Sequence, residues 1–156
     1  MNILKKITIL VLGSILMVSC NLNEDPKFDD SEAFVAFRSS ELSLGEEKTE
    51  EIKIPVLLTS LAGLSSSVDF EIITEGSTAI EGKHFTIVNT SKTLNFTKDQ
   101  PTQDIIVKTI DNSTFDGDVS FAIKLNDPGD VNLGASKKIN IKINDDEHPL
   151  LFILGS

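Results

Sequence analysis

Hydrophobic and polar residues alternate one by one in two segments near the C-terminus, at 120–126 and 138–144. The hydrophobic members are Phe121, Ile123 and Leu125 in the first segment and Ile139, Ile141 and Ile143 in the second. The residues between them are polar or small, among them Lys138, Asn140 and Lys142. A period of two is that of a β-strand with one buried and one solvent-facing side, so both segments predict such strands.

Shorter segments of the same kind precede these two along the chain. They lie at 33–37, 42–44, 52–58, 68–72, 85–87, 94–96 and 105–107. Pro55, within 52–58, predicts an edge strand or a bulge, because proline has no N–H to donate to a neighbouring strand. Turn residues separate the segments, and none shows a convincing helical period of 3.6 residues. We therefore expect an all-β fold, an antiparallel β-sandwich of about seven to eight strands.

The N-terminal residues 1–19 have the pattern of an export signal. Two lysines precede the apolar stretch 7–18, which is shorter than the roughly 20 residues that a membrane-spanning helix needs. The stretch ends in Leu-Met-Val-Ser-Cys at 16–20, which resembles the signal of bacterial lipoproteins. This pattern predicts cleavage before Cys20, its lipidation, and anchoring in the outer membrane of the bacterial cell envelope. The alternative is an ordinary signal peptide with an incidental cysteine.

Composition predicts three further divisions of the chain. Residues 20–31 are polar and acidic and predict a flexible tether, because such a segment buries too little apolar surface to fold. The acids soon after Cys20 either resemble a surface-export signal of Gram-negative lipoproteins or belong to a plain solvated linker. The folded domain is expected at 32–148. The short apolar tail 149–156 is either a last edge strand or the first strand of a further domain.

The chain is acidic, since its 156 residues carry 24 acids and 14 bases, a formal net charge of −10. The expected leader contains two of the bases and none of the acids, so the mature protein is more acidic still. An acidic surface repels phosphate backbones, which argues against nucleic-acid binding, and it attracts divalent cations. Surface acids that serve solubility alone are the alternative. The single cysteine excludes an intrachain disulfide.

Acidic residues flank the two C-terminal strands. Asp111, Asp116 and Asp118 precede the first strand, and Asp145, Asp146 and Glu147 follow the second. If the strands pair antiparallel across the Asp-Pro-Gly-Asp loop at 127–130, both acidic groups lie at the same end of the sheet. Oxygen ligands that converge on one rim are those that calcium prefers. The other interpretation is that these acids merely occupy turns, which Asp and Asn favour.

An ordered series of motifs between residues 76 and 148 resembles the Calx-β domain, a calcium-associated β-sandwich with an immunoglobulin-like fold. The motifs are Gly-Ser-Thr-Ala at 76–79, Gly-Lys-His-Phe at 82–85, Thr-Leu-Asn-Phe at 93–96, the acidic turn 110–121, Leu-Gly at 133–134 and Ile-Asn-Asp-Asp-Glu at 143–147. The resemblance implies calcium ligands at one end of the sandwich. By matching positions these are Glu46 (or its neighbour Glu47), Asp111, Asn112, Asp116, Asp145, Asp146 and Glu147.

Three positions depart from the family pattern. His84 and Asn112 stand where the family has carboxylates, and Val119 stands where it has Glu. Histidine is a poor ligand for a hard cation and valine is none, whereas Asn112 still offers a neutral carbonyl oxygen. With these departures the resemblance implies weak binding of one calcium ion rather than a cluster of several ions.

The sequence predicts a protein without catalytic activity. His84 and His148 are the only histidines, no zinc-type cluster of cysteine and histidine is present, and nothing resembles a nucleophile elbow. We expect an extracytoplasmic module for protein interaction or adhesion, attached to the membrane by its lipid. The alternative is a glycan-binding lipoprotein that assists an outer-membrane uptake system. The absence of Trp and Tyr disfavours it, because sugar sites use these rings as flat platforms.

Overall fold

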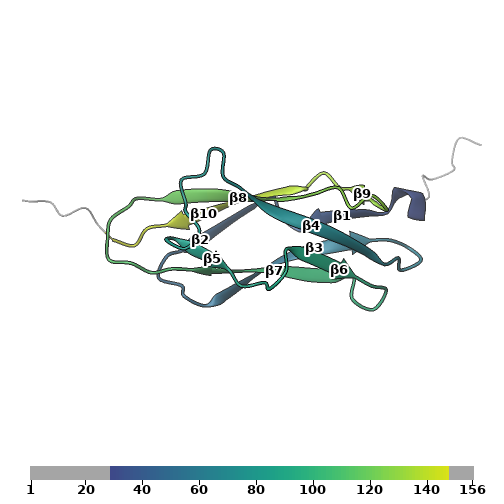
Figure 1. The fold of residues 1–156 in the computed structure, drawn as a ribbon, viewed down its shortest axis with the longest axis horizontal. Coiled ribbons are helices and arrows are strands. Elements are labelled where there is room, and N and C mark those ends of the chain that lie inside the picture. Colours follow the sequence, from purple (N-terminus) through teal and green to yellow (C-terminus); the bar gives the residue numbers. More distant parts are fainter. Residues whose placement is uncertain (1–28, 148–156) are drawn as a thin grey trace, which may run out of the picture.

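The computed structural model describes residues 29–147, which form a β-sandwich elongated along its strands (Figure 1). A short 3₁₀-helix, η1 (Asp30–Glu32), precedes the strands. The strands are β1 (Phe34–Phe37), β2 (Glu41–Gly45), β3 (Glu51–Thr59), β4 (Ser66–Ile73), β5 (Phe85–Ile87), β6 (Thr93–Phe96), β7 (Thr102–Thr109), β8 (Val119–Leu125), β9 (Asn132–Leu133) and β10 (Lys138–Asn144). The all-β class is confirmed, with more strands than the seven to eight expected. In this part of the chain no helix has the length and apolarity to cross a membrane.

Two five-stranded sheets make up the sandwich. Their strand orders are β5-β7-β3-β1-β9 and β2-β10-β8-β4-β6. Most neighbouring strands are antiparallel, but β9 pairs parallel with β1, and β2 pairs parallel with β10. The consecutive strands β1 and β2 lie in different sheets. Ser39 lies in the crossing between them and donates its hydroxyl hydrogen to the carbonyl of Glu41 at 2.8 Å.

The two C-terminal segments of strict alternation form β8 and β10, which pair antiparallel with Ile141 opposite Phe121. The three isoleucines of β10 are at most 2% exposed, whereas Lys138, Asn140 and Lys142 are exposed. Phe85 of β5 stacks on Phe121 with 3.7 Å between the ring centroids, which joins the two sheets through the core. Burial of each such large side chain stabilises the fold by about 1.5–3 kcal/mol. The expected inward and outward faces are confirmed.

Pro55 lies in β3, between β7 and β1, so its expected place in an edge strand or bulge is wrong. The proline is tolerated because the ladder with β1 ends beside it. Phe37 pairs with Val56, and the N–H of Arg38 donates to the Pro55 carbonyl at 3.2 Å. The nitrogen and the carbonyl of a strand residue face the same side of the strand, so the Pro55 nitrogen also faces β1. Because β1 leaves the sheet at this point, the missing N–H of Pro55 breaks no ladder hydrogen bond.

η1 lies at one end of the long axis (Figure 1). The Asp30 carboxylate accepts hydrogen bonds from the N–H groups of Leu61 and Ala62, at 2.7 and 2.9 Å, which ties η1 to the β3–β4 connection. The folded unit thus extends back to Asp29, ahead of the expected start at residue 32. The expected signal peptide 1–19, Cys20, most of the tether and the tail 149–156 lie outside the described residues.

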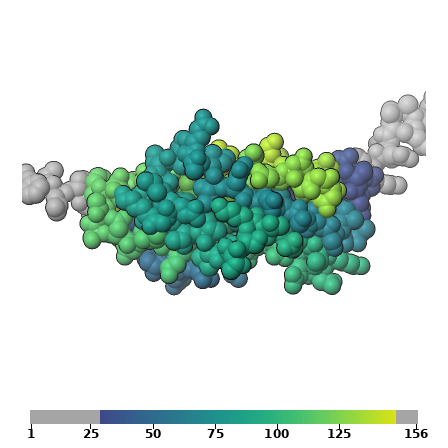
Figure 2. Space-filling model, in the orientation of Figure 1, coloured from purple at the N-terminus to yellow at the C-terminus, as the bar shows by residue number. Residues whose placement is uncertain are grey.

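The connection between β4 and β5 carries Lys83 and His84 to the other end of the molecule. It first projects from the sandwich as a narrow protrusion (Figure 2) and then returns to β8, where the N–H of Thr78 donates to the Ser120 carbonyl at 2.8 Å. A turn follows, in which the N–H groups of Lys83 and His84 both donate to the carbonyl of Ile80. This turn sets both side chains beside the loop that joins β7 to β8.

Candidate metal centre

The antiparallel pairing of β8 with β10 places the loop before β8 and the segment after β10 at the same end of the sandwich (Figure 1). The two segments are joined by hydrogen bonds. The N–H groups of Asp116 and Gly117 donate to Asp145 Oδ2, at 2.7 and 2.6 Å. The N–H of Asp145 donates to Asp118 Oδ1 at 3.2 Å. The expected meeting of the two acidic groups is confirmed, and we call this end, comprising residues 110–118, 145–147 and Glu46, the acidic rim.

The parallel pairing of β2 with β10 adds Glu46 to the rim. Gly45 lies opposite Asn144, so Glu46 and Asp145 leave the sheet side by side. The following set forms a group in which one carboxylate oxygen of each residue lies within 4.8 Å of the others: Glu46, Asp145, Asp146 and Glu147. We call it the four-carboxylate group. Glu47, the alternative to Glu46, is exposed and lies outside it.

Two members of the group have buried carboxylate oxygens. Glu46 is 3% exposed, and its Oε1 accepts a hydrogen bond from Asn112 Nδ2. Burial, followed by the charge of Asp145, raises the pKa of Glu46 above its usual value. Glu147 Oε2 is buried and has no hydrogen-bond partner among the described residues. Burial and the neighbouring carboxylates of Asp145 and Asp146 raise the pKa of Glu147.

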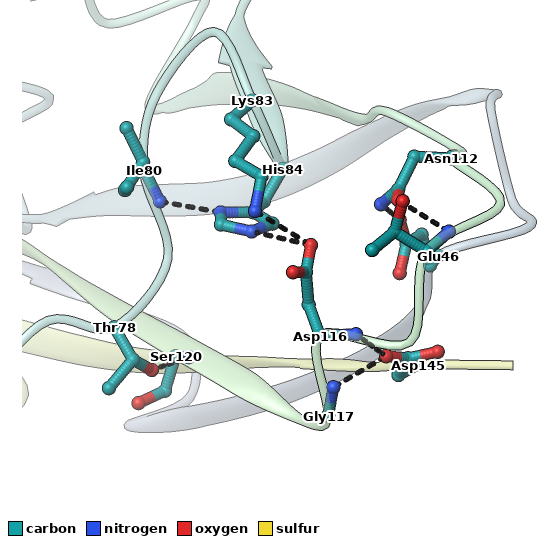
Figure 3. Close-up of polar contacts among 11 residues, drawn as sticks. Glu46, Thr78, Ile80, Lys83, His84, Asn112, Asp116, Gly117, Ser120 and Asp145 are labelled. Atoms are coloured by element: carbon teal, nitrogen blue, oxygen red, sulfur yellow. Dashed lines mark hydrogen bonds and ion pairs between the residues drawn. The ribbon is translucent and has the colours of Figure 1, made fainter. Parts of the chain in front are cut away.

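Asp145 connects the four-carboxylate group to the loop before β8 (Figure 3). Besides the two bonds to its Oδ2, its Oδ1 accepts the N–H of Glu147 at 2.8 Å. Partial burial raises the pKa of Asp145, but the N–H groups of Glu147, Gly117 and Asp116 outweigh it and lower that pKa below its usual value. Asp145 therefore stays ionised at a pH where its neighbours Glu46 and Glu147 begin to take up protons.

Asp116, an expected ligand, turns its carboxylate away from the four-carboxylate group (Figure 3). Its Oδ2 lies 2.8 Å from Lys83 Nζ and 3.4 Å from His84 Nε2. The hydrogen bond from Lys83 lowers the pKa of Asp116. His84 is 4% exposed, and its Nδ1 accepts the N–H of Ile80 at 2.8 Å. The neutral ring therefore carries its proton on Nε2, which faces Asp116.

Asp118 is likewise paired with a lysine. Its carboxylate lies 2.6 Å from Lys142 Nζ on β10, and this contact lowers the pKa of Asp118. Asp111 is exposed and lies outside the four-carboxylate group. Of the seven expected ligands, the structure brings four together, sets Asn112 against Glu46, and leaves Asp111 and Asp116 apart. The lysine partners were not anticipated, because a contact between separate segments leaves no local signal in the sequence.

The four-carboxylate group fits a calcium ion. All four residues supply oxygen, and calcium takes about six to eight oxygen ligands, with carbonyls and water completing the set. Within residues 29–147, no lysine, arginine or histidine nitrogen lies within 4.0 Å of these carboxylates. Glu147 Oε2, which is buried without a hydrogen-bond partner among the described residues, also favours a bound cation. Carboxylates this close repel one another, and a divalent cation offsets that repulsion.

Solved structures with the same fold include two that are named for Calx. The apo-form Calx CBD1 domain has a TM-score of 0.64 and 24% sequence identity, over 74% of this chain and 98% of that one. CBD12 from CALX1.2 has a TM-score of 0.64 and 25% identity, over 74% of this chain and 45% of that one. A putative carbohydrate binding protein from Bacteroides ovatus has a TM-score of 0.53 and 10% identity, over 71% of this chain and 36% of that one.

Among curated proteins, none matches the sequence. The model of the Calx-beta domain matches residues 29–147, the same residues that form the sandwich and carry the acidic rim. The match spans well over half of the chain and agrees with the motifs read from the sequence. The chain belongs to the Calx-beta domain family.

Proposed function

We propose that this protein is a lipid-anchored interaction module of the cell envelope that binds one calcium ion. The ligands are the four-carboxylate group, Glu46, Asp145, Asp146 and Glu147. Calx-beta domains are non-catalytic binding domains and often bind calcium, which supports the assignment. The observation that carries it is Glu46, a carboxylate 3% exposed that lies beside three further acids with no basic side chain near it in residues 29–147.

A bound calcium ion supplies the positive charge that offsets the repulsion within the group. The chain's own residues connect the group to the loop 110–118. Glu46 accepts a hydrogen bond from Asn112 near the start of the loop, and Asp145 accepts two from its end. Phe115 lies between these attachment points and is 51% exposed. A protein partner that contacts Phe115 therefore meets a loop whose position depends on the calcium ligands.

The lipid anchor and the acidic rim are expected at opposite ends of the module. The described chain begins at η1, and Figure 1 shows η1 at the far end of the sandwich from the loop 110–118. The segment between Cys20 and Asp29 spans at most about 30 Å when extended. This arrangement favours a rim that faces away from the membrane, where a partner outside the cell envelope can reach it.

Calorimetric titration of the mature protein with calcium tests the proposed site. We expect one ion per chain with a dissociation constant of about 10⁻⁴–10⁻³ M, as in other extracellular calcium modules. Glu46→Gln should weaken binding at least tenfold, whereas Glu47→Gln, a change in its exposed neighbour, should leave it within twofold. If the unmodified protein binds no calcium, the site is a set of turn residues.

Membrane fractionation tests the anchor. Cys20→Ala should release the protein from the membrane fraction or block its processing, because stable anchoring needs more than one acyl chain and the lipidated cysteine carries them. Lys27→Ala, seven residues further on in the expected tether, leaves the whole signal 16–20 intact and serves as the control. If Cys20→Ala still fractionates with membranes as mature protein, the anchor is not a lipid on this residue.

Glycan binding is the second candidate, and the exposure of Phe115 favours it. An exposed phenylalanine beside Asp116 and near Asn112 offers a flat ring next to polar groups, which partly replaces the missing Trp and Tyr. Binding of the mature protein to a glycan array distinguishes the two functions. Glycan binding that Phe115→Ala abolishes would support the second candidate, and an array without signal would leave protein interaction.

A further inference from the structure

The acids of the rim fall into two classes according to their partners. The members of the four-carboxylate group have no basic side chain within 4.0 Å in the described chain, residues 29–147. Asp116 and Asp118, in contrast, each have a lysine nitrogen close by, at 2.8 Å from Lys83 and 2.6 Å from Lys142. Some acids of the rim thus lack a positively charged partner, whereas others are already paired with a lysine side chain.

Asp116 stands at the boundary between the two classes. Its backbone N–H donates to Asp145, a member of the four-carboxylate group, while its carboxylate points to the opposite side, toward Lys83 and His84 (Figure 3). Without Lys83, this carboxylate would have no lysine partner and would keep only the contact with His84 Nε2, while its backbone stays bonded to Asp145 of the group. Whether it takes part in ion binding therefore depends on what its own side chain contacts.

Lys83 is well placed to hold the Asp116 carboxylate. Its backbone is fixed by the turn in which the Lys83 N–H donates to the Ile80 carbonyl at 3.1 Å. The neighbouring ring of His84, 4% exposed and held by the N–H of Ile80, places its Nε2 3.4 Å from the same oxygen of Asp116. An exposed ion pair adds little to stability, so the effect of Lys83 is expected in the charge of the rim rather than in the fold.

We infer that Lys83 is a built-in counter-ion for Asp116, which keeps this carboxylate out of metal binding and limits the acidic rim to one ion. The inference rests on the proposed calcium binding for the first ion but concerns a different carboxylate. A single ammonium group neutralises Asp116 without drawing in further oxygen ligands, whereas a second calcium ion would need several. The ammonium group of Lys83 therefore neutralises the charge of Asp116, as the calcium ion offsets the charge of the four-carboxylate group.

Equilibrium dialysis of the full-length mature protein against calcium, with the number of bound ions counted, tests this inference. We would compare the unmodified protein with Lys83→Glu, Asp116→Asn and the double variant of both. Lys124→Glu is the matched control, because Lys124 also forms a lysine–carboxylate pair, with Glu71 at 3.4 Å, but lies well along β8 from the rim. Lys83 and Lys124 are both about half exposed, so both variants are expected to fold.

We expect one ion in the unmodified protein, and Asp116→Asn should leave its affinity within twofold. Lys83→Glu should bind one ion more, and the double variant should lose that extra ion. Lys124→Glu should bind as the unmodified protein does. The inference is overturned if Asp116→Asn weakens binding tenfold or more, if the unmodified protein binds two ions, or if Lys83→Glu binds no more than the unmodified protein.

Failure of the proposed function gives a different result. If the unmodified protein binds no calcium and Lys83→Glu binds an ion that Asp116→Asn removes, the four-carboxylate group is no metal site but Lys83 still acts as inferred. If neither protein binds calcium, both ideas fail.

Discussion

Gly117 shows how a single residue determines the shape of the acidic rim. Its φ of +72° lies in the left-handed region that glycine adopts without strain, and its N–H donates to Asp145 at 2.6 Å. A residue with a side chain would therefore be strained at this turn of the loop 110–118 toward Asp145. Gly76, with a φ of +75°, has the same backbone conformation in the connection between β4 and β5, outside the acidic rim.

Gly117→Ala is therefore expected to act on both stability and calcium binding. A side chain in the left-handed conformation costs about 1–2 kcal/mol, so the free energy of unfolding should fall by that amount. The Asp145 carboxylate should also lose its orientation, and calcium should bind several-fold more weakly. Gly76→Ala should cost similar stability without changing calcium affinity. Urea unfolding and calorimetric titration measure the two effects, and equal loss of affinity in both variants would contradict the prediction.

The rim contains acids whose pKa values are shifted in opposite directions. Burial raises the pKa of Glu46 and that of Glu147 above the usual 4.5. Such acids destabilise the fold at neutral pH, and this cost disappears as the pH falls toward 4.5. Contacts with Lys83 and Lys142 lower the pKa of Asp116 and that of Asp118 below the usual 3.8. These acids stabilise the fold above pH 3.8 and lose that contribution as the pH falls through their folded-state values.

Stability in chelator is thus expected to depend on pH in two phases. The free energy of unfolding should rise slightly between neutral pH and about 4.5, as Glu46 and Glu147 take up protons, and should fall below about 3.8. Calcium affinity should decrease in the first phase, because protonated carboxylates are poor ligands. Urea unfolding across this pH range measures the effect. A steady loss of stability from neutral pH downward would show that the buried acids are not destabilising.

At the scale of the elements, β8 and β10 follow directly from their alternating residues. Ile139, Ile141 and Ile143 face the core because every second side chain of a strand points to the same side. The two-residue strand β9 was not anticipated, since two residues cannot show an alternation, and it exists through its parallel pairing with β1. The prediction for Pro55 was wrong for a related reason. The proline is tolerated because β1 ends beside it, and the residues around Pro55 do not show where β1 ends.

Ile141→Ala tests the inward face of β10. Ile141 is 0% exposed and lies opposite Phe121, so its truncation should lower the free energy of unfolding by about 2–5 kcal/mol through lost burial and a cavity. Lys138→Ala, on the outward face of the same strand, should change it by less than about 0.5 kcal/mol. Chemical unfolding of both variants measures the difference, and equal losses would mean that the alternation does not mark the core.

At the scale of the whole molecule, calcium and folding are expected to be coupled. Glu46 directly follows β2 and the other three members directly follow β10, so the four-carboxylate group exists only when these strands pair. The unfolded chain should therefore bind calcium much more weakly. At a free calcium concentration of 100 times the dissociation constant, the free energy of unfolding should rise by about 2.7 kcal/mol.

The double change Asp145→Asn and Asp146→Asn should abolish this calcium-induced rise and relieve repulsion within the group when calcium is absent. Melting curves of both proteins in chelator and in millimolar calcium measure the two effects. A double change Asp127→Asn and Asp130→Asn, in the loop between β8 and β9, removes the same charge away from the group and should leave the rise intact. An unmodified protein whose melting does not respond to calcium would have kept the family's fold without its metal.

The sequence by itself determined the class of fold, the inward faces of the strands and the end of the sandwich where acids gather. These features depend on local patterns. The alternation sets which side of a strand is buried, and an antiparallel pair joined by one connection brings the start of β8 next to the end of β10. The motifs around residues 76–148 also sufficed to identify the family.

The tertiary structure alone decided which acids form one group. Glu46 joins Asp145 because β2 pairs parallel with β10, a contact between residues about a hundred positions apart. Asp116 leaves the group because Lys83, 33 positions earlier, reaches its carboxylate from the turn before β5. The direction of a loop side chain depends on which other segments pack against the loop. That packing is set by the fold of the whole sandwich and not by the residues next to it in the sequence.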